Sequence, residues 1–145
     1  MYLKQTNGTV VFPYNLSQLK KDFPNISFPS PISESDLNAH GVYRVINGQK
    51  PLNDEASYYT LGFPYQDSND MWVIDYNKNL YPESVASQNV KKKRTDLLEE
   101  CDWTQLPDSP LSDSDKTAWA TYRQALRDVP SQEGFPFTIT WPTKP

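Results

Sequence analysis

The sequence predicts an α+β fold, with a small antiparallel β unit at the N-terminus followed by a helical hairpin and an aromatic, Pro-rich tail strand. Three observations predict it. Short β-prone runs separated by turn signals fill the first half of the chain. Hydrophobic residues then recur at helical spacing, and a last aromatic run lies between prolines. We therefore expect two domains, a β-rich one over residues 1–80 and a helical one over residues 81–145.

The N-terminal domain is expected to begin with a β-hairpin. Residues 2–12 are β-prone on both sides of Asn7-Gly8, and an Asn-Gly pair accepts the positive φ angles of a two-residue hairpin turn. Residues 16–22 then predict a short helix that stops before Pro24, because a residue that precedes proline avoids helical geometry.

A second short helix is expected between Ser33 and Ala39. Ser33 with Asp36 three positions later resembles a capping box, and Gly41 ends the helix. Further β-prone runs follow at residues 42–46, 57–65 and 71–76, with Asn47-Gly48 and residues 67–70 as turns.

The C-terminal domain is expected to contain two helices joined by an elbow. The segment between Pro82 and Glu100 has no internal Gly or Pro and carries one modest apolar stripe. Ser112 with Asp115 is a second capping box, which begins a helix that ends before Pro130. The proline-punctuated elbow spans residues 102–110, and the tail strand spans residues 135–142.

Composition and charge exclude several classes of partner. The formal net charge of −4 argues against nucleic acid, whose phosphates need a concentrated basic surface. The one basic run, residues 91–94, is followed by Asp96 and Glu99, which predicts a solvated helix face with ion pairs. No apolar run approaches the roughly 20 residues of a membrane span, and we expect a protein made in a reducing cytoplasm, where the lone Cys101 forms no intrachain disulfide.

The sequence also predicts no catalytic, cofactor-binding or metal site. The single histidine, His40, precedes Gly41 at a helix end, where an imidazole can bond a free carbonyl. Cys101 has no base beside it and is expected to be a small buried hydrophobe. Glu99 and Glu100 are adjacent on a helix and point in different directions, so they cannot act together as acid and base. We expect a protein that is not an enzyme.

Residues 101–108, Cys-Asp-Trp-Thr-Gln-Leu-Pro-Asp, resemble the signature of phage tail assembly chaperone and tail-fibre assembly proteins. The resemblance continues over residues 119–128 and closes at residues 134–136 and 141–145, in the order and spacing of the family. It implies a bacteriophage protein that binds tail-fibre or other tail proteins and promotes their assembly or attachment. The motif does not decide between transient action and retention; we expect a protein that works in the host cytoplasm during assembly and remains in the virion tail. Two alternatives stay open: a permanent structural component of the baseplate or fibre, and a receptor-binding tip without a chaperone role.

Five residues of the signature are expected to build the C-terminal scaffold, although each could instead contact a partner. The aromatic residues have the spacing of core anchors, and an arginine fork could lock the elbow at Asp102 and Asp108. The five scaffold residues are Trp103, Trp119, Tyr122, Arg123 and Trp141.

Partner binding is expected in the N-terminal domain, which has more aromatic residues than a small β unit can bury. An exposed aromatic patch is typical of a protein interface, and a carbohydrate-binding surface is the alternative. The six candidate residues are Tyr58, Tyr59, Phe63, Tyr65, Trp72 and Tyr76.

Overall fold

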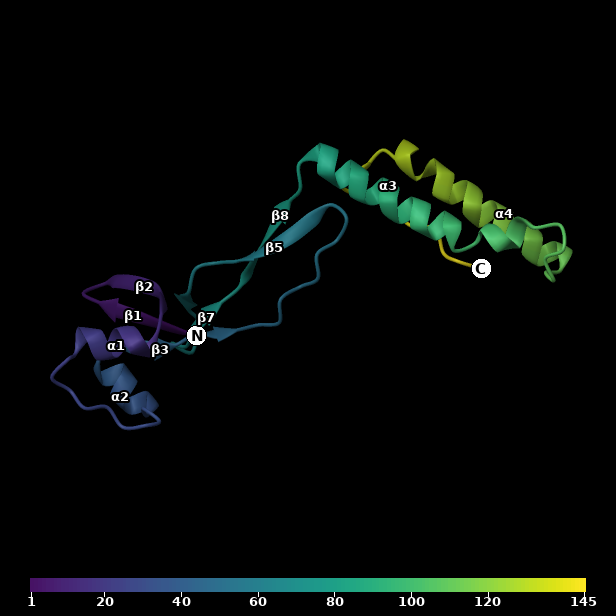
Figure 1. Cartoon of the computed structure of the whole chain (residues 1–145). Coiled ribbons are helices and arrows are strands. Elements are labelled where there is room, and N and C mark those ends of the chain that lie inside the picture. The colour runs from purple at the N-terminus through teal and green to yellow at the C-terminus, as the bar shows by residue number, and fades with distance from the viewer. The chain divides into compact units, whose positions relative to one another are not determined.

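The computed structural model describes all 145 residues and confirms the α+β class (Figure 1). The chain forms two compact units. Unit 1 comprises Met1–Pro51 and Thr60–Asn77, and unit 2 comprises Leu52–Tyr59 and Lys78–Pro145. The division therefore differs from a single boundary near residue 80, because the segment Leu52–Tyr59 packs with the C-terminal part of the chain.

Unit 1 begins with a three-stranded antiparallel sheet in the order β2-β1-β3. Asn7 and Gly8 join the first two strands with φ angles of 50° and 79°, so the predicted hairpin turn is confirmed. Leu3 in the middle strand is fully buried and belongs to one of the two hydrophobic clusters of this unit. The strands are β1 (Tyr2–Thr6), β2 (Thr9–Tyr14) and β3 (Val42–Arg44).

Two short capped helices, α1 (Leu16–Asp22) and α2 (Glu34–Ala39), lie beside this sheet in Figure 1. The side chain of Asn15 accepts a bond from the Gln18 backbone nitrogen at 2.9 Å, and the Ser33 hydroxyl accepts one from Asp36 at 3.1 Å. Each bond satisfies an N–H group that has no partner inside the helix. The helices then bury Leu19 and Leu37 against Tyr14 and Val42, which form the second cluster.

The second sheet of unit 1 has the order β4-β7-β6, and its strands are β4 (Ile46–Asn47), β6 (Tyr65–Gln66) and β7 (Trp72–Ile74). β4 pairs with β7 in parallel, and neither Asn47 nor Gly48 has a positive φ angle. The turn predicted at Asn47-Gly48 is therefore wrong, because no β-prone segment follows directly that could return alongside the strand.

A two-stranded sheet joins β5 (Ser57–Leu61) to β8 (Tyr76–Leu80). The strand predicted over residues 57–65 is interrupted after Leu61. There the Gly62 nitrogen bonds the Asp75 carbonyl at 2.8 Å, and a Cβ on Gly62 would lie 2.9 Å from that oxygen. The backbone approaches too closely for a side chain at this position, and Pro64, which cannot donate to a ladder, follows it.

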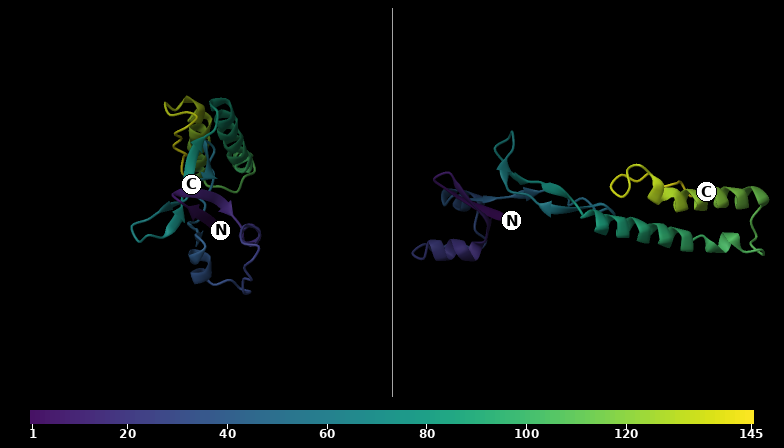
Figure 2. Two further views of the ribbon diagram at one scale, coloured as in Figure 1. Left: turned by 90° about the vertical axis from the view of Figure 1, so that its left-hand side faces the viewer. Right: turned by 90° about the horizontal axis from the view of Figure 1, so that it is seen from above.

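Unit 2 is built on a helical hairpin of α3 (Glu83–Glu99) and α4 (Asp113–Asp128), which lie side by side and run in opposite directions (Figures 1 and 2). The Ser112 hydroxyl caps α4 by accepting a bond from the Asp115 nitrogen at 3.1 Å, as predicted. The short 3₁₀ helices η1 (Asp102–Gln105) and η2 (Val129–Ser131) follow α3 and α4. None of the helices is both long and apolar enough to cross a membrane.

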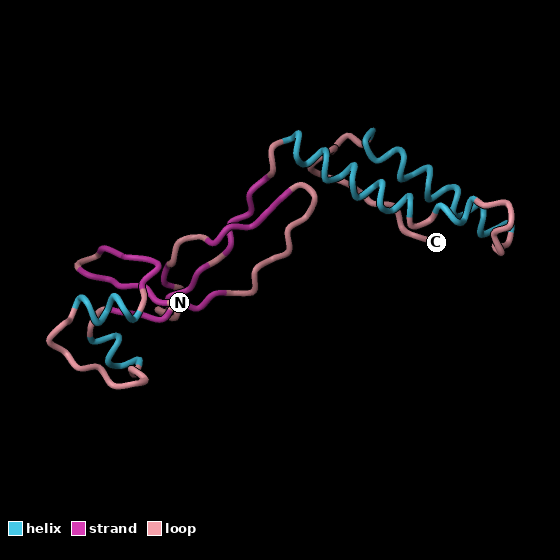
Figure 3. Tube along the Cα trace, viewed as in Figure 1, coloured by secondary structure: helices cyan, strands magenta, loops and turns pink.

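The C-terminal tail does not pair as a strand and is drawn as loop to its end in Figure 3. Successive turns occupy residues 133–137, and the backbone nitrogens of Phe137 and Thr138 both bond the Gly134 carbonyl. Gln132 then holds Thr140 through two bonds of 2.8 and 2.9 Å. These local bonds satisfy the backbone groups that a ladder would have used.

Gly41 gives a stability test of the junction between α2 and β3. Its φ angle is +71°, and a Cβ there would lie 2.5 Å from the Gln5 carbonyl oxygen. Gly41→Ala should therefore lower the free energy of unfolding by about 2–4 kcal/mol, from left-handed strain plus overpacking. Gly8→Ala is the matched control, because Gly8 has a φ angle of +79° with no atom near the added Cβ, and it should cost only about 1 kcal/mol. Equal losses in urea unfolding would contradict the close approach at Gly41.

Candidate functional site

A buried arginine holds the elbow of unit 2 together. The Arg123 guanidinium on α4 donates bonds from Nη1 to the Leu98 carbonyl at 2.7 Å and to Cys101 Sγ at 3.0 Å. From Nη2 it donates to the Asp102 carboxylate at 2.7 Å. One side chain thus ties α4 to the end of α3 and to the start of η1. Asp108, the other carboxylate expected at the elbow, is not among its partners.

The bonds to Leu98 and Cys101 are the less exposed part of this clasp. Asp102 is 62 % exposed, so its ion pair contributes little by itself. The Leu98 carbonyl belongs to the last turn of α3, where carbonyls lack helical partners. Burial alone would lower the pKa of Arg123, but the bonds to Asp102 and Cys101 outweigh it and the pKa is raised. The guanidinium therefore stays charged in the elbow.

Three of the other scaffold candidates belong to one hydrophobic cluster, in which Trp119 and Trp141 pack against the buried Tyr122. Trp119 lies between Trp103 and Tyr122, with ring centroids 6.3 and 5.7 Å away. Tyr122 is buried, Trp119 is half-buried, and Trp103 is 46 % exposed. Trp141 in the tail lies under the Lys93 amine, 4.7 Å from the ring centroid. Trp119, Tyr122 and Trp141 therefore lie where core anchors are expected, whereas Trp103 lies at the exposed edge.

Apolar surface remains at the elbow of unit 2, which the signature alone does not reveal. The chain turns through η1 and carries Trp103 and Leu106 outward, and both are large and exposed. Their neighbours Cys101 and Thr104 are buried. A 3₁₀ helix repeats every three residues, so residues 101 and 104 are buried on one side while residues 103 and 106 are exposed on the other. The helix has only four residues, which is too few for this period to be recognised in the sequence.

The six aromatic candidates for partner binding are divided between the two units. Four of them belong to unit 1 and two to unit 2. Tyr58 packs on Tyr81 with ring centroids 4.9 Å apart. The members in unit 1 are Phe63, Tyr65, Trp72 and Tyr76, and those in unit 2 are Tyr58 and Tyr59.

Exposure separates the four candidates of unit 1. Phe63 is 63 % exposed and Tyr65 is also exposed, whereas Tyr76 is half-buried. Trp72 is only 8 % exposed and packs in the core with Val45 and Ile74. Trp72 therefore cannot offer a ring face at the surface, because Trp72 and Ile74 are the two inward residues of the alternating strand β7.

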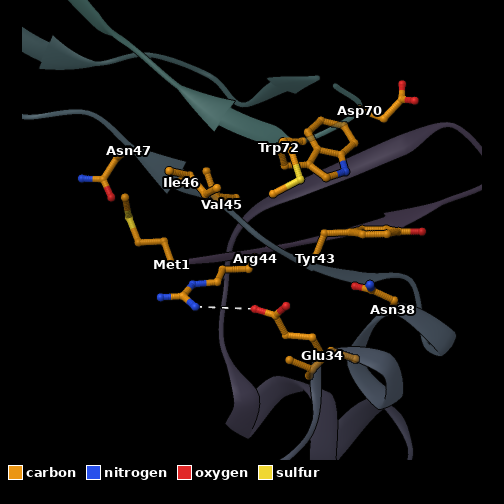
Figure 4. A pocket seen from close by; sticks show the side chains of 12 residues that line it. Met1, Glu34, Asn38, Tyr43, Arg44, Val45, Ile46, Asn47, Asp70 and Trp72 are labelled. Carbon is orange, nitrogen blue, oxygen red and sulfur yellow. Dashed lines mark hydrogen bonds and ion pairs between the residues drawn. The ribbon is translucent and has the colours of Figure 1, made fainter. Parts of the chain in front are cut away.

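A pocket of about 700 Å³ opens in unit 1 between α2, β3, β4 and the start of β7 (Figure 4). Met1, Tyr43, Ile46 and Trp72 provide its apolar lining. At its edge, Arg44 and Glu34 form an ion pair with an N–O distance of 3.5 Å. Sequence reasoning missed this pocket, because its walls come from segments about 70 positions apart and no local pattern marks them.

Reactive side chains in both units are engaged in structural contacts. The His40 Nδ1 atom lies 2.7 Å from the Asp36 carbonyl oxygen, which is the helix-end bond expected for it, and its ring packs edge-on against Phe23 and Phe28. Cys101 is fully buried and donates to the carbonyls of the last turn of α3. No group of three or more His, Cys, Asp or Glu side chains is arranged to hold a metal ion.

Comparison with known proteins gives one match. Residues 87–145 match the family model for the phage tail assembly chaperone protein. The matched segment contains Arg123 with all of its bonding partners and the whole aromatic group of the elbow. No curated protein and no solved structure matches the chain.

Two arginines of α4 allow a matched test of the clasp. Arg123→Ala should lower the free energy of unfolding by about 2–3 kcal/mol, because it leaves the Leu98 carbonyl with fewer donors and removes a packed alkyl stem. Arg127→Ala is the control, since Arg127 is exposed and bonds only Gln124 at 3.4 Å, and it should stay within about 0.5 kcal/mol of the parent. Chemical denaturation of both variants checks this, and equal effects would show that the buried bonds add nothing.

Proposed function

We propose, from the premise that residues 87–145 belong to the phage tail assembly chaperone family, that this protein binds tail-fibre or other tail proteins, promotes their assembly or attachment, and is retained in the virion tail. Family membership itself supports a role in phage tail assembly, which takes place in the host cytoplasm. The fibre partner and the retention in the particle are the further steps of the proposal.

The continuity of the matched residues carries this proposal. They include most of α3, the elbow, α4 and the tail. The matched segment is therefore the helical hairpin of unit 2 together with the Arg123 bonds that hold its elbow. A chaperone surface needs apolar groups that stay available, and the elbow keeps Trp103 and Leu106 exposed. Large aromatic residues of this kind are common anchors of protein interfaces.

Unit 1 is proposed to provide partner recognition. It lies outside the matched residues, and it exposes Phe63 and Tyr65. The Tyr65 hydroxyl donates to Asp75, which fixes the ring in one orientation at the surface. A ring that is already ordered loses less conformational entropy on binding than a free one.

The proposed function involves no catalysis. This part of the proposal is supported by the contacts of His40 and Cys101, the two side chains best suited to act as a base or a nucleophile. His40 bonds a helix carbonyl, and Cys101 accepts a bond from Arg123 beneath the surface. Both groups serve the fold in these contacts, and neither is among the residues that line the pocket of unit 1.

Co-expression with the tail-fibre protein of the same phage tests the chaperone role. The protein should raise the yield of soluble, detergent-resistant fibre trimer, because it would cover apolar surface that the fibre chains expose before they assemble into the trimer. A Trp103→Ala, Leu106→Ala double variant, which leaves the clasp intact, is the comparison for the elbow surface. Equal trimer yield with and without the protein would exclude the chaperone role and favour a purely structural component or a receptor-binding tip.

Mass spectrometry of purified virions tests retention. If the protein stays on a trimeric fibre, its copy number in the particle should be a multiple of three, and antibody labelling should place it on the tail. Absence from virions that assembled in its presence would mean that it acts transiently.

A further inference from the structure

The pocket of unit 1 has the size of a binding site. Its volume of about 700 Å³ lies within the range of roughly 300–1,000 Å³ that ligand sites occupy. It is open to solvent, and its walls combine apolar side chains with a polar rim.

Both methionines of the chain line this one pocket. Met1 and Met71 are each 48 % exposed, although a thioether side chain is usually buried. Methionine is unbranched and polarisable, so it adapts to apolar groups of different shape and is favoured at surfaces that bind several sequences. Ile46 continues the apolar wall and is also exposed. The lining suits a large apolar side chain.

A buried donor in the pocket wall has no acceptor. The indole nitrogen of Trp72 is buried without a hydrogen-bond partner, and Figure 4 shows it on the edge of the ring that faces Tyr43. Indole N–H groups usually find a partner when they are buried. A carbonyl oxygen that entered the pocket would supply one, once the side chains that bury the nitrogen moved slightly aside.

The backbone beside the pocket favours an extended occupant. β4 is the outer strand of its sheet, so one of its edges has no paired strand, and both of its residues line the pocket. An unpaired edge can accept an added strand from another chain. Such a strand carries an apolar side chain that could fill the pocket and a carbonyl oxygen that could accept the hydrogen bond from Trp72.

We propose that the pocket of unit 1 binds an extended segment of the tail protein, with a large apolar side chain between Met1 and Met71 and a main-chain carbonyl that accepts from Trp72 Nε1. The segment lies along the free edge of β4. This assignment rests on the proposed function, since it names how the tail partner is held. It also extends the partner surface beyond Phe63 and Tyr65 to Met1, Ile46 and Met71, which an aromatic pattern does not mark, and it gives Trp72 a role through its N–H group rather than its ring face.

The two methionines make the pocket directly observable. Protein labelled with ¹³C in the methionine methyl groups gives two signals, one from each side of the pocket. Short overlapping synthetic peptides that cover the tail-fibre protein are the probes. At least one peptide with a large apolar residue should shift both signals in a saturable titration, and replacement of that residue by serine should abolish the shift.

Variants locate the binding energy. Ile46→Asp places a charge in the apolar wall and should raise the peptide Kd by at least about tenfold. Val11→Asp is the matched control, because Val11 is another strand residue of unit 1 with similar exposure, 49 % against 46 %, and it lies outside the pocket. Trp72→Phe keeps a ring but removes the N–H, and it should raise Kd by about fivefold. Melting curves of all three variants identify any loss of folding, and the Ile46→Asp comparison stands if Trp72→Phe does not fold.

Several outcomes would overturn the assignment. Peptides that bind without shifting either methionine signal would place the binding site elsewhere, and equal Kd values for Ile46→Asp and Val11→Asp would do the same. Signals that shift with protein concentration alone would show that a second copy of the chain occupies the pocket. Signals that respond to methyl glycosides but to no peptide would show a carbohydrate site. Fibre trimer yield separates the two proposals. Unchanged yield with saturable peptide shifts removes the chaperone role and leaves the pocket, whereas increased yield with silent methionines removes the pocket alone.

Discussion

A single buried guanidinium sets the geometry on which unit 2 depends. Two helices of moderate apolar content would have little reason to adopt one fixed register, since α3 buries only Ala86 and Val90. Arg123 supplies that register by bonding a carbonyl, a thiol and a carboxylate that are adjacent in the elbow. Planar, fixed donors make such a bond set specific in direction. The exposed Trp103 directly follows Asp102, one of the residues that the arginine holds.

Sequence patterns predicted the local structure well wherever one short-range bond decides it. The hairpin at Asn7-Gly8 and the caps at Ser33 and Ser112 depend only on neighbouring residues, and all three form. The same Asn-Gly signal failed at residues 47 and 48, because a turn also needs a returning strand. The tail failed as a strand for a related reason, since Gly134 and Gln132 satisfy its backbone locally.

The candidate sites were less accessible to sequence reasoning, because burial and proximity are long-range properties. An aromatic surplus indicates that some rings are exposed but cannot say which ones, and the strand register turned Trp72 inward while Phe63 stayed outside. The pocket depends on two pairings, β1 with β3 and β4 with β7, which bring Met1 and Met71 to one cavity. The Arg123–Asp102 ion pair was within reach of prediction because both residues lie in recognisable blocks.

The segment Leu52–Tyr59 has a consequence for how such genes can recombine. It belongs to unit 2, where the Glu55 carbonyl accepts a bond from Asn89 at 3.1 Å and the Glu55 carboxylate pairs with Lys93 at 2.6 Å. A recombination crossover near residue 80 would join the helical hairpin to a different N-terminal region and so remove both contacts. A mosaic keeps both contacts only if it carries this eight-residue segment along with the hairpin.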